Sequence, residues 1–237
     1  MSSKTFPSLE FETALIARGS RFIIGIDEVG RGAIAGPVAV AASLIDSRSE
    51  SFSKPWPTAL ADSKLMTEKA RIATAPQVLD WAEDVRVGFV EAAEIDARGI
   101  TKSLASAAGK ALSALLESPV LRSQIASDGA TIILDGSHNW LGSQASGVDV
   151  IARTKADRDC VSVACASVVA KVQRDNLMIQ LSKEHLGYLF DGHKGYASAA
   201  HIAAIRELGP SAQHRITWLT KILADGEIDG FAELGEV

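Results

Sequence analysis

The sequence contains few cysteines and no long hydrophobic run. Its two cysteines, Cys160 and Cys165, have no CxxC spacing and no nearby pair of histidines. They therefore indicate neither a zinc site nor a disulfide framework. We expect both thiols to be small buried groups in one helix. No apolar run approaches the roughly 18 residues that a transmembrane helix needs.

The N-terminus also lacks the apolar core of a signal peptide. Residues 1–20 are interrupted by Glu10 and Glu12, and no hydrophobic stretch of the required length precedes or follows these acids there. With no membrane segment and no disulfide framework, the sequence predicts a cytoplasmic protein that does not associate with a membrane. It gives no sign of obligate oligomerisation, and we expect a monomer.

An overall positive charge is missing as well, since the net charge is −5. This charge is unevenly distributed. Residues 153–221 carry ten basic and six acidic side chains, whereas residues 222–237 carry five acidic and no basic ones. We expect this acidic tail to be a solvated terminus. Because a local basic surface decides nucleic-acid binding, the basic section leaves a nucleic-acid partner open.

The order of the predicted elements indicates an α/β fold. A chain of 237 residues with 47% hydrophobic residues can bury one large core. Hydrophobic patterning predicts strands at about 22–27, 37–45, 84–91, 130–135 and 147–152. It predicts helices at 7–20, 67–82, 92–117, 158–183, 198–208 and 214–224. Three early strands followed by helices alternating with two more strands favour a mixed five-stranded sheet flanked by helices.

The first strand ends in two adjacent acids, Asp27 and Glu28, followed by the turn Gly30-Arg31-Gly32. Charges at the end of a buried strand are costly unless a partner compensates them. A metal ion or a catalytic role would provide that compensation, and a hairpin with a solvated tip is the alternative. Adjacent strand residues point to opposite faces. Both acids could serve one site if the strand bends into the turn.

Two further acids lie where later strands end. Asp135 closes the strand at 130–135, and Asp157 follows the fifth strand. Taken singly, Asp135 could belong to an ordinary turn and Asp157 could cap its helix. Ligands in open α/β sheets bind at strand ends, and four crowded carboxylates need cations to stay ionised. Oxygen ligands favour Mg²⁺ or Mn²⁺, and two such ions about 4 Å apart serve in-line displacement at phosphorus.

Several motifs carry a family resemblance. In order and spacing, the chain resembles bacterial ribonuclease HII, the type 2 ribonuclease H family, from about residue 7 to 220. The matching segments are DEVGRGAIAGP (27–37), DSK (62–64), LDG (134–136), KAD (155–157), ASVVAKVQRD (166–175), GY (195–196) and HRITW (214–218). The first of these is the most specific, and the later ones gain weight from their shared order.

The resemblance implies a ribonuclease H-like fold and a metal-dependent endoribonuclease. Such an enzyme hydrolyses the RNA strand of RNA–DNA hybrids and incises at single ribonucleotides embedded in duplex DNA, leaving a 3′-hydroxyl and a 5′-phosphate. On this basis we expect an N-terminal helix packed on the domain (1–20), a catalytic core (21–190), and a C-terminal helical extension with the acidic tail (191–237).

The resemblance also assigns roles to individual residues. Four of them match the acids that bind two divalent ions, Mg²⁺ or Mn²⁺: Asp27, Glu28, Asp135 and Asp157. Three match the loop that senses the ribose 2′-hydroxyl: Gly30, Arg31 and Gly32. Ser63 and Lys64 match a segment near the DNA phosphates, and Tyr196 matches a tyrosine that stacks on the following deoxyribose.

Three positions depart from the family pattern. Ala197-Ser198 replaces a common Pro-Thr after the tyrosine, Ala61 stands where Asn is frequent, and Trp218 replaces a common Phe. None of these positions is one of the four acids. The first departure weakens the expected placement of the tyrosine, because a proline would stiffen its loop.

Other functions remain open from sequence. A junction resolvase or an exonuclease of the same fold would also gather acids at strand ends, but would not need the Gly30–Gly32 loop. A catalytically silent hybrid-binding protein would not need four intact acids. Ribonuclease HIII, the sibling family, is less favoured because no extra N-terminal domain precedes Phe22.

Overall fold

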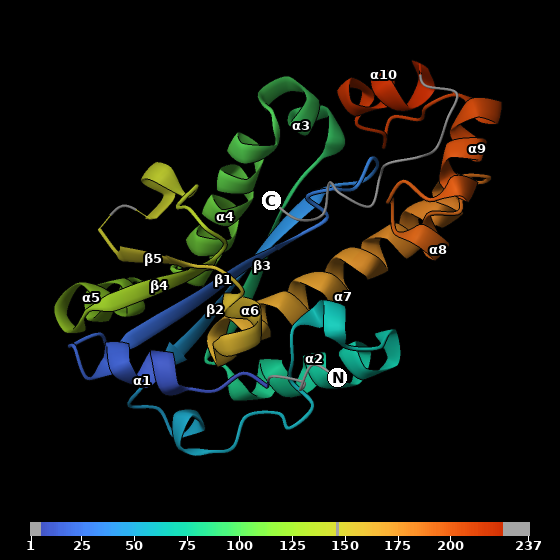
Figure 1. Ribbon diagram of the computed structural model, residues 1–237. Helices are drawn as coiled ribbons and strands as arrows, with labels where there is room; N and C mark the ends of the chain where they lie inside the picture. Colours follow the sequence, from blue (N-terminus) through green and yellow to red (C-terminus); the bar gives the residue numbers. More distant parts are fainter. Residues whose placement is uncertain (1–5, 146, 225–237) are drawn as a thin grey trace.

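A five-stranded mixed sheet forms the centre of the computed structural model, which describes residues 6–145 and 147–224 (Figure 1). Its strands are β1 (Phe22–Val29), β2 (Val38–Asp46), β3 (Asp84–Val90), β4 (Ala130–Asp135) and β5 (Asp149–Arg153). Their spatial order is β3-β2-β1-β4-β5. β2 runs antiparallel to β1 and β3, whereas β4 runs parallel to β1 and β5. The predicted mixed five-stranded sheet is therefore confirmed.

Helices cover both faces of this sheet. On one face, α7 (Val161–Glu184) packs against β1 and β2, with α2 (Glu68–Trp81) against α7 and α1 (Glu10–Ile16) beside β1. On the other face, α4 (Ile100–Leu115) packs against β2 and β3. This layering places each face of the central strand β1 in a hydrophobic core, which explains its nearly continuous apolar sequence.

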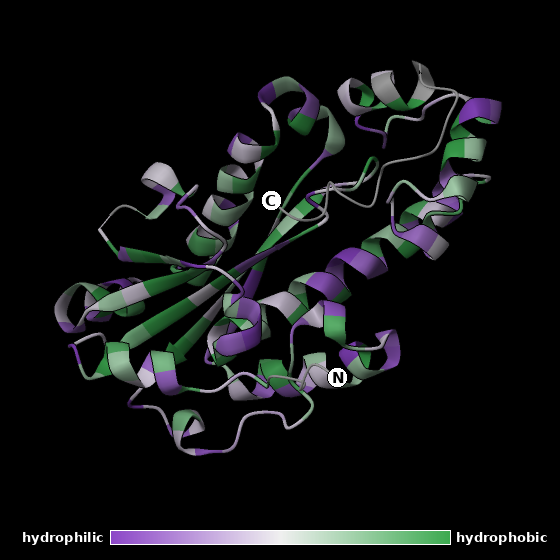
Figure 2. Ribbon diagram, in the orientation of Figure 1, coloured by the Kyte–Doolittle hydropathy of each residue, from purple (hydrophilic) through white to green (hydrophobic). Residues whose placement is uncertain are grey.

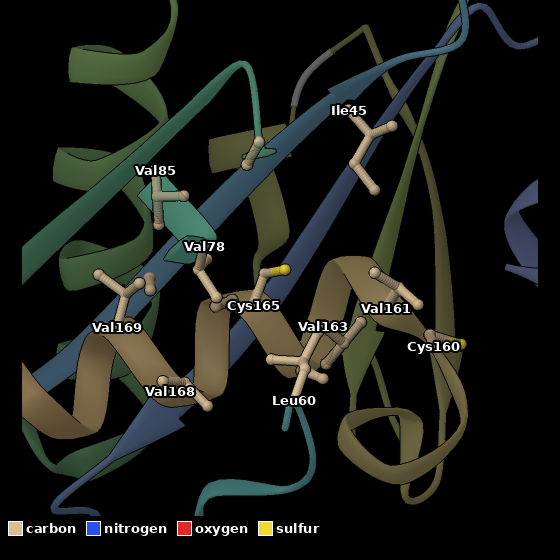
Figure 3. Packing of buried hydrophobic residues seen from close by; sticks show 14 of the residues in the cluster. Ile45, Leu60, Val78, Val85, Cys160, Val161, Val163, Cys165, Val168 and Val169 are labelled. Atoms are coloured by element: carbon tan, nitrogen blue, oxygen red, sulfur yellow. The ribbon is translucent and has the colours of Figure 1, made fainter. Parts of the chain in front are cut away.

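The side chains of β1 alternate between the two cores. Ile23 joins the cluster under α7, whereas Phe22, Ile24 and Ile26 join the cluster under α4. Figure 2 shows hydrophobic residues concentrated in the strands, and Figure 3 shows valines and a cysteine of α7 within the first cluster. The alternation continues to the end of the strand and decides which way Asp27 and Glu28 point.

A third hydrophobic cluster lies at the far end of α7. The helices α8 (Phe190–His193), α9 (Ala199–Leu208) and α10 (Ile216–Ala224) lie together there in Figure 1. Met178 and Leu181 of α7 pack in this cluster with Phe190, Ile202 and Leu219. The predicted helices at 198–208 and 214–224 are found here. The acidic tail lies outside the described residues from position 225 onward.

Two predicted helices are interrupted. The helix expected at 92–117 is divided into α3 (Ala92–Arg98) and α4 by Gly99, whose φ of 79° ends the first segment. The helix expected at 158–183 is divided into α6 (Ala156–Asp159) and α7 by Cys160, which is extended and forms a bridge with Ser8. Cys160 is therefore not helical, although both free cysteines are buried as predicted.

One helix was missed. α5 (Pro119–Asp128) begins at a proline two residues beyond the helix predicted at 92–117. Proline is well tolerated at the first helical position, where its missing N–H is not needed. Ser118 caps this helix by accepting a hydrogen bond from the backbone N–H of Leu121. Among the described residues, no helix is long and apolar enough to cross a membrane.

Candidate active site

Asp27 and Asp135 lie side by side at the end of two neighbouring parallel strands. The β1–β4 pairing ends with Ile26 opposite Leu134, so the next residue of each strand is one of these two acids. Because the strands are parallel and in register, both carboxylates point to the same face, toward the start of α7. Asp27 is 7% exposed and Asp135 is half-buried. The predicted meeting of strand-end acids is thus realised for this pair.

Asp157 reaches the same place from the turn after β5. Lys155, with a φ of 61°, forms the left-handed turn before α6, and the Ala156 N–H donates a 2.8 Å hydrogen bond to Oδ1 of Asp135. This bond fastens the turn to the end of β4. Asp157 is consequently buried next to Asp135, and the negative charge of Asp135 acts to raise the pKa of Asp157. The N-cap residue of α6 is Lys155, and no side chain caps this helix, so Asp157 lies in the first turn without being its cap.

Glu28 lies on the opposite face of β1 from Asp27. The β1–β2 pairing continues regularly through Val29, so the strand does not bend before Glu28. The pairing with β4, however, stops two residues before Glu28. β4 itself ends at Asp135, so no residue of β4 lies opposite Glu28. The charge of Glu28 acts to raise the pKa of Asp27, and the charge of Asp135 acts to raise the pKa of Glu28.

Burial and mutual repulsion shift the pKa values of these acids. Burial, with the charges of Glu28, Asp135 and Asp157, holds the pKa of Asp27 well above its ordinary value. Burial and the nearby charge of Asp135 raise the pKa of Asp157 to about 7. The pKa of Glu28 is raised mainly by burial, although Arg31 acts to lower it. The cluster therefore holds more negative charge than its own surroundings neutralise.

The donor set fits a hard divalent cation, because it consists of carboxylate oxygens in a partly buried cluster of like charges. The side chains are not gathered around one point, however. Within residues 6–145 and 147–224, no three His, Cys, Asp or Glu side chains are grouped closely enough to hold one ion. Oδ1 of Asp27 instead accepts the Glu28 N–H at 2.8 Å, and Oδ1 of Asp135 is bonded to Ala156.

The DSK segment adds a cation and a further acid to the cluster. Burial acts to lower the pKa of Lys64, but attraction from Asp27, Asp157, Asp62 and Glu28 raises it overall. Asp62 is 1% exposed and accepts hydrogen bonds from the Lys64 N–H at 2.8 Å and from Nε of Arg158 at 3.2 Å. Asp62 was not predicted as a site residue, although it belongs to the DSK motif that carries part of the family resemblance.

Ser63 is buried, whereas its neighbour Lys64 is exposed. The Ser63 hydroxyl accepts a 2.9 Å hydrogen bond from the hydroxyl of Ser167 on α7. Ser167 in turn acts on Asp27, since its hydroxyl helps to lower the pKa of that acid. Ser63 is therefore linked to the acid cluster through Ser167 and is not accessible to a ligand. Lys64 is exposed and is the residue of the two that a ligand can contact. Ser167 was not predicted as a site residue, because no local pattern within the segment 166–175 distinguishes its hydroxyl from a surface serine.

The loop from Gly30 to Gly32 adjoins the acids. Gly30 is buried with a φ of 80°, and a Cβ there would lie 2.1 Å from Nε of Arg174. Only glycine fits this position. Arg31 is partly exposed and its Nη1 lies 3.4 Å from Oε1 of Glu28, while Gly32 is exposed. The loop thus presents bare backbone within four residues of Glu28.

Tyr196 lies on the far side of this loop and is 37% exposed. Its ring is 5.6 Å from the Arg174 guanidinium carbon and 5.7 Å from the Lys171 ammonium nitrogen. The preceding Gly195 carbonyl accepts hydrogen bonds from the N–H groups of Ile34 and Ala35. The tyrosine segment and the glycine loop are therefore hydrogen-bonded to each other, although about 160 residues separate them in sequence.

The order and directions of the strands, with helices on both faces, define a ribonuclease H-like fold. Solved structures agree on the fold. Ribonuclease H2 of Pyrococcus horikoshii matches with a TM-score of 0.62 and 22% identity, covering 83% of this chain and 93% of that protein. Bst-RNase HIII in complex with Mn²⁺ matches with a TM-score of 0.56 and 24% identity, covering 84% of this chain and 67% of that protein.

Sequence comparison gives the family. The family model described as Ribonuclease HII matches residues 24–221. A ribonuclease HII of Streptomyces avermitilis is 43% identical over 200 residues, which cover 84% of this chain and 78% of that protein. One of Streptomyces coelicolor is 40% identical with the same coverage. The chain belongs to the ribonuclease HII family, as the sequence motifs predicted, and is a hydrolase of the nuclease class.

Proposed function

We propose that this chain is an endoribonuclease that cuts the RNA strand of RNA–DNA hybrids and incises duplex DNA at single embedded ribonucleotides. One observation carries the proposal: two acids of the cluster stand at the end of β1, and a glycine-rich loop follows them directly. Asp27 and Glu28 supply carboxylates, and Gly30 to Gly32 supply a surface that a sugar can approach closely. The ribose 2′-hydroxyl is the group that distinguishes RNA from DNA at such a surface.

The four acids would hold two divalent ions in this proposal, Mg²⁺ or Mn²⁺. When bound, such ions supply an activated water and stabilise the leaving oxygen of an in-line displacement at phosphorus. Asp27 and Asp135 would bind from the shared strand edge, with Asp157 from the α6 turn and Glu28 from the opposite face. The raised pKa of Asp27 and of Asp157 supports this role, because a cation relieves the repulsion that causes it.

The remaining residues would place the substrate. Lys64 is exposed beside the acids and is suited to a backbone phosphate. Arg31 lies within the Gly30–Gly32 loop beside Glu28, and the partly exposed ring of Tyr196 offers a face to the sugar beyond the ribonucleotide. Ser63 would contribute indirectly, since its hydroxyl is buried against Ser167. We further propose that the protein acts as a monomer; its cytoplasmic location stays a prediction.

Cleavage of matched duplexes tests the proposal. An RNA–DNA hybrid, a DNA duplex with one ribonucleotide and an all-DNA duplex of the same sequence are compared with Mg²⁺ or Mn²⁺. We expect cutting of the first two and none of the third. Equal cutting of the all-DNA duplex would favour a nuclease without sugar recognition. No cutting together with firm binding of the hybrid would favour a silent binding protein.

A further inference from the structure

Two fully buried arginines hold the inner side of the loop at 30–37. Arg174 on α7 and Arg215 at the start of α10 are both 0% exposed. Among the described residues, neither forms an ion pair with a carboxylate. A buried charge is costly unless hydrogen bonds compensate it. Each guanidinium instead donates hydrogen bonds to backbone carbonyls. Their burial therefore indicates that the backbone of the loop at 30–37 has to be held in one conformation.

Arg215 makes all its side-chain hydrogen bonds to this loop. Nη2 donates to the Gly30 carbonyl at 2.7 Å and to the Gly36 carbonyl at 3.1 Å. Nη1 donates to the Arg31 carbonyl at 2.8 Å, and Nε donates to the Gly36 carbonyl at 3.3 Å. Three carbonyls of one loop are thus fixed by one planar group. Burial and the charge of nearby Arg174 lower the pKa of Arg215 to about 9, although Asp96 acts to raise it.

The same residue joins the loop to the tyrosine segment through its backbone. The Arg215 N–H donates to the Ile34 carbonyl at 2.9 Å, and the Ile34 N–H donates to the Gly195 carbonyl at 2.9 Å. Arg174 adds a second link, because its Nη1 donates to the Lys194 carbonyl and its Nη2 to the Ala35 carbonyl. The residues next to Tyr196 and the residues next to Gly30 therefore share one hydrogen-bonded frame.

We propose that Arg215 is a positioning residue for sugar discrimination. Gly30 and Gly32 have no side chains with which to fix their own backbone, so the geometry that a ribose meets must be set from the inner side of the loop. Arg215 sets it through the carbonyls of Gly30 and Arg31. This inference rests on the proposed function. It holds that Arg215 fixes the position of the loop backbone that contacts the ribose 2′-hydroxyl.

The variant Arg215→Lys tests the inference. Lysine keeps the charge but loses the rigid planar fork that reaches three carbonyls at once. We expect kcat at a single ribonucleotide to fall about 10- to 100-fold, as a misplacement near 1 Å can cause. KM and the Mn²⁺ concentration for half-maximal activity should change little, whereas the thermal midpoint should fall because buried carbonyls lose their donors. The matched control is Arg206→Lys on α9, where the arginine is exposed and no change is expected.

A second variant keeps the test decisive if Arg215→Lys does not fold. Asp96 on α3 is partly exposed and accepts hydrogen bonds from the N–H groups of Ile216 and Thr217, directly after Arg215. Asp96→Ala should loosen Arg215 without removing it and lower the same kcat by a smaller factor. Hydrogen exchange in the peptide containing residues 30–37 should rise in both variants.

The outcomes separate the two proposals. If the wild-type protein prefers ribonucleotide-containing duplexes but the folded variants keep its kcat and its preference, the inference on Arg215 is wrong and the proposed function stands. If the wild-type protein cuts all-DNA duplexes equally, both proposals fail together. A lower thermal midpoint with unchanged kcat would give Arg215 a purely structural role and would also overturn the inference.

Discussion

Asp135 and Ala156 are joined by a 2.8 Å hydrogen bond from the backbone N–H of Ala156 to Oδ1 of Asp135. Because Ala156 directly precedes Asp157, this bond sets the distance between two acids that lie 22 positions apart in sequence. One carboxylate oxygen of Asp135 is thus occupied by a hydrogen bond that holds the turn before α6 in place. The acid cluster is therefore built into the fold, and folding has to overcome the repulsion within it.

That repulsion predicts a stability gain when Asp157 is neutralised. In protein stripped of divalent ions at pH 8, Asp157→Asn should raise the free energy of unfolding by roughly 1–3 kcal/mol, because one pKa unit corresponds to about 1.4 kcal/mol. The variant should lose cleavage while still binding a hybrid. Urea unfolding with chelator and then with excess Mg²⁺ measures the effect.

Magnesium should stabilise the wild-type protein more than Asp157→Asn, since fewer like charges remain in the variant for a cation to relieve. Asp80→Asn is the control, because Asp80 is exposed on α2 away from the cluster. A variant with wild-type cleavage would remove Asp157 from the mechanism. If Asp157→Asn and the wild-type protein have the same free energy of unfolding in chelator, repulsion within the acid cluster does not destabilise the fold.

The hydrogen bonds of Asp62 predict a different effect. Asp62 is almost fully buried and accepts hydrogen bonds from Arg158, whose side chain is 41% exposed, and from the backbone N–H of Lys64. Asp62→Ala should cost about 1–3 kcal/mol, because it removes two hydrogen bonds to a charged group. Asp84→Ala breaks an ion pair with Arg86 in which Arg86 is 52% and Asp84 is 30% exposed, and should cost less than about 1 kcal/mol. Chemical denaturation of both variants provides the comparison. Equal losses in the free energy of unfolding would contradict a larger stabilising role for Asp62 than for Asp84.

Much of the fold could be predicted from local sequence. Strand β4 was predicted with its observed bounds, since a short apolar run ending in Asp135-Gly136 has few other interpretations. The interruption at Cys160 could not be predicted, because its extended conformation accompanies pairing with Ser8, about 150 residues earlier. The bounds of β1 were two residues too short, since the acids read as the end of the strand continue its pairing with β2.

The candidate site was predictable to a similar degree. Acids at strand ends are visible in the sequence, and the structure places Asp27 and Asp135 at neighbouring strand ends with Asp157 after the turn that is hydrogen-bonded to Asp135. Among the described residues, these acids are not grouped closely enough for three of them to hold one ion. The supporting groups were not visible in the same way. Ser167 and Arg215 owe their importance to contacts with residues about 100 or more positions away, and no local pattern marks a buried arginine that bonds carbonyls. Topology is needed to find them.

The paired histidines of the C-terminal helices predict a pH dependence of stability. Nε2 of His201 lies 3.1 Å from Nε2 of His214, and both rings are buried. Burial, with the nearby His193, lowers the pKa of each to about 4 from an ordinary 6.5. The unfolded chain therefore binds more protons than the folded protein between pH 6.5 and 4. Their stability contribution is complete above pH 6.5 and is lost as the pH falls toward 4.

Replacing one of these histidines should reduce that pH dependence. Each histidine contributes a slope of up to about 1.4 kcal/mol per pH unit in this window. His201→Gln should remove about one such slope, measured by urea unfolding at pH 7, 6 and 5. His138→Gln is the control, because His138 is exposed. If both variants show the wild-type slope, the buried pair does not govern acid stability.

The close approach of β1 and α7 gives the last prediction. A Cβ on Gly25 would lie 2.2 Å from the carbonyl carbon of Ser162 and 2.5 Å from the backbone nitrogen of Val163. Backbone cannot rotate away as a flexible side chain can, so strand and helix would have to separate. Gly25→Ala should therefore cost about 3 kcal/mol or more and displace Asp27, two residues along the strand.

Gly192→Ala provides the matched control for this substitution. Gly192 lies in α8 with an ordinary φ, and a Cβ there meets no heavy atom within 4 Å. Its substitution should be neutral or slightly stabilising, because alanine loses less conformational freedom on folding. Thermal unfolding and cleavage are measured on both variants. Wild-type stability in Gly25→Ala would mean that α7 can move away from β1 without cost, which would contradict the tight packing that places Ser167 behind Asp27.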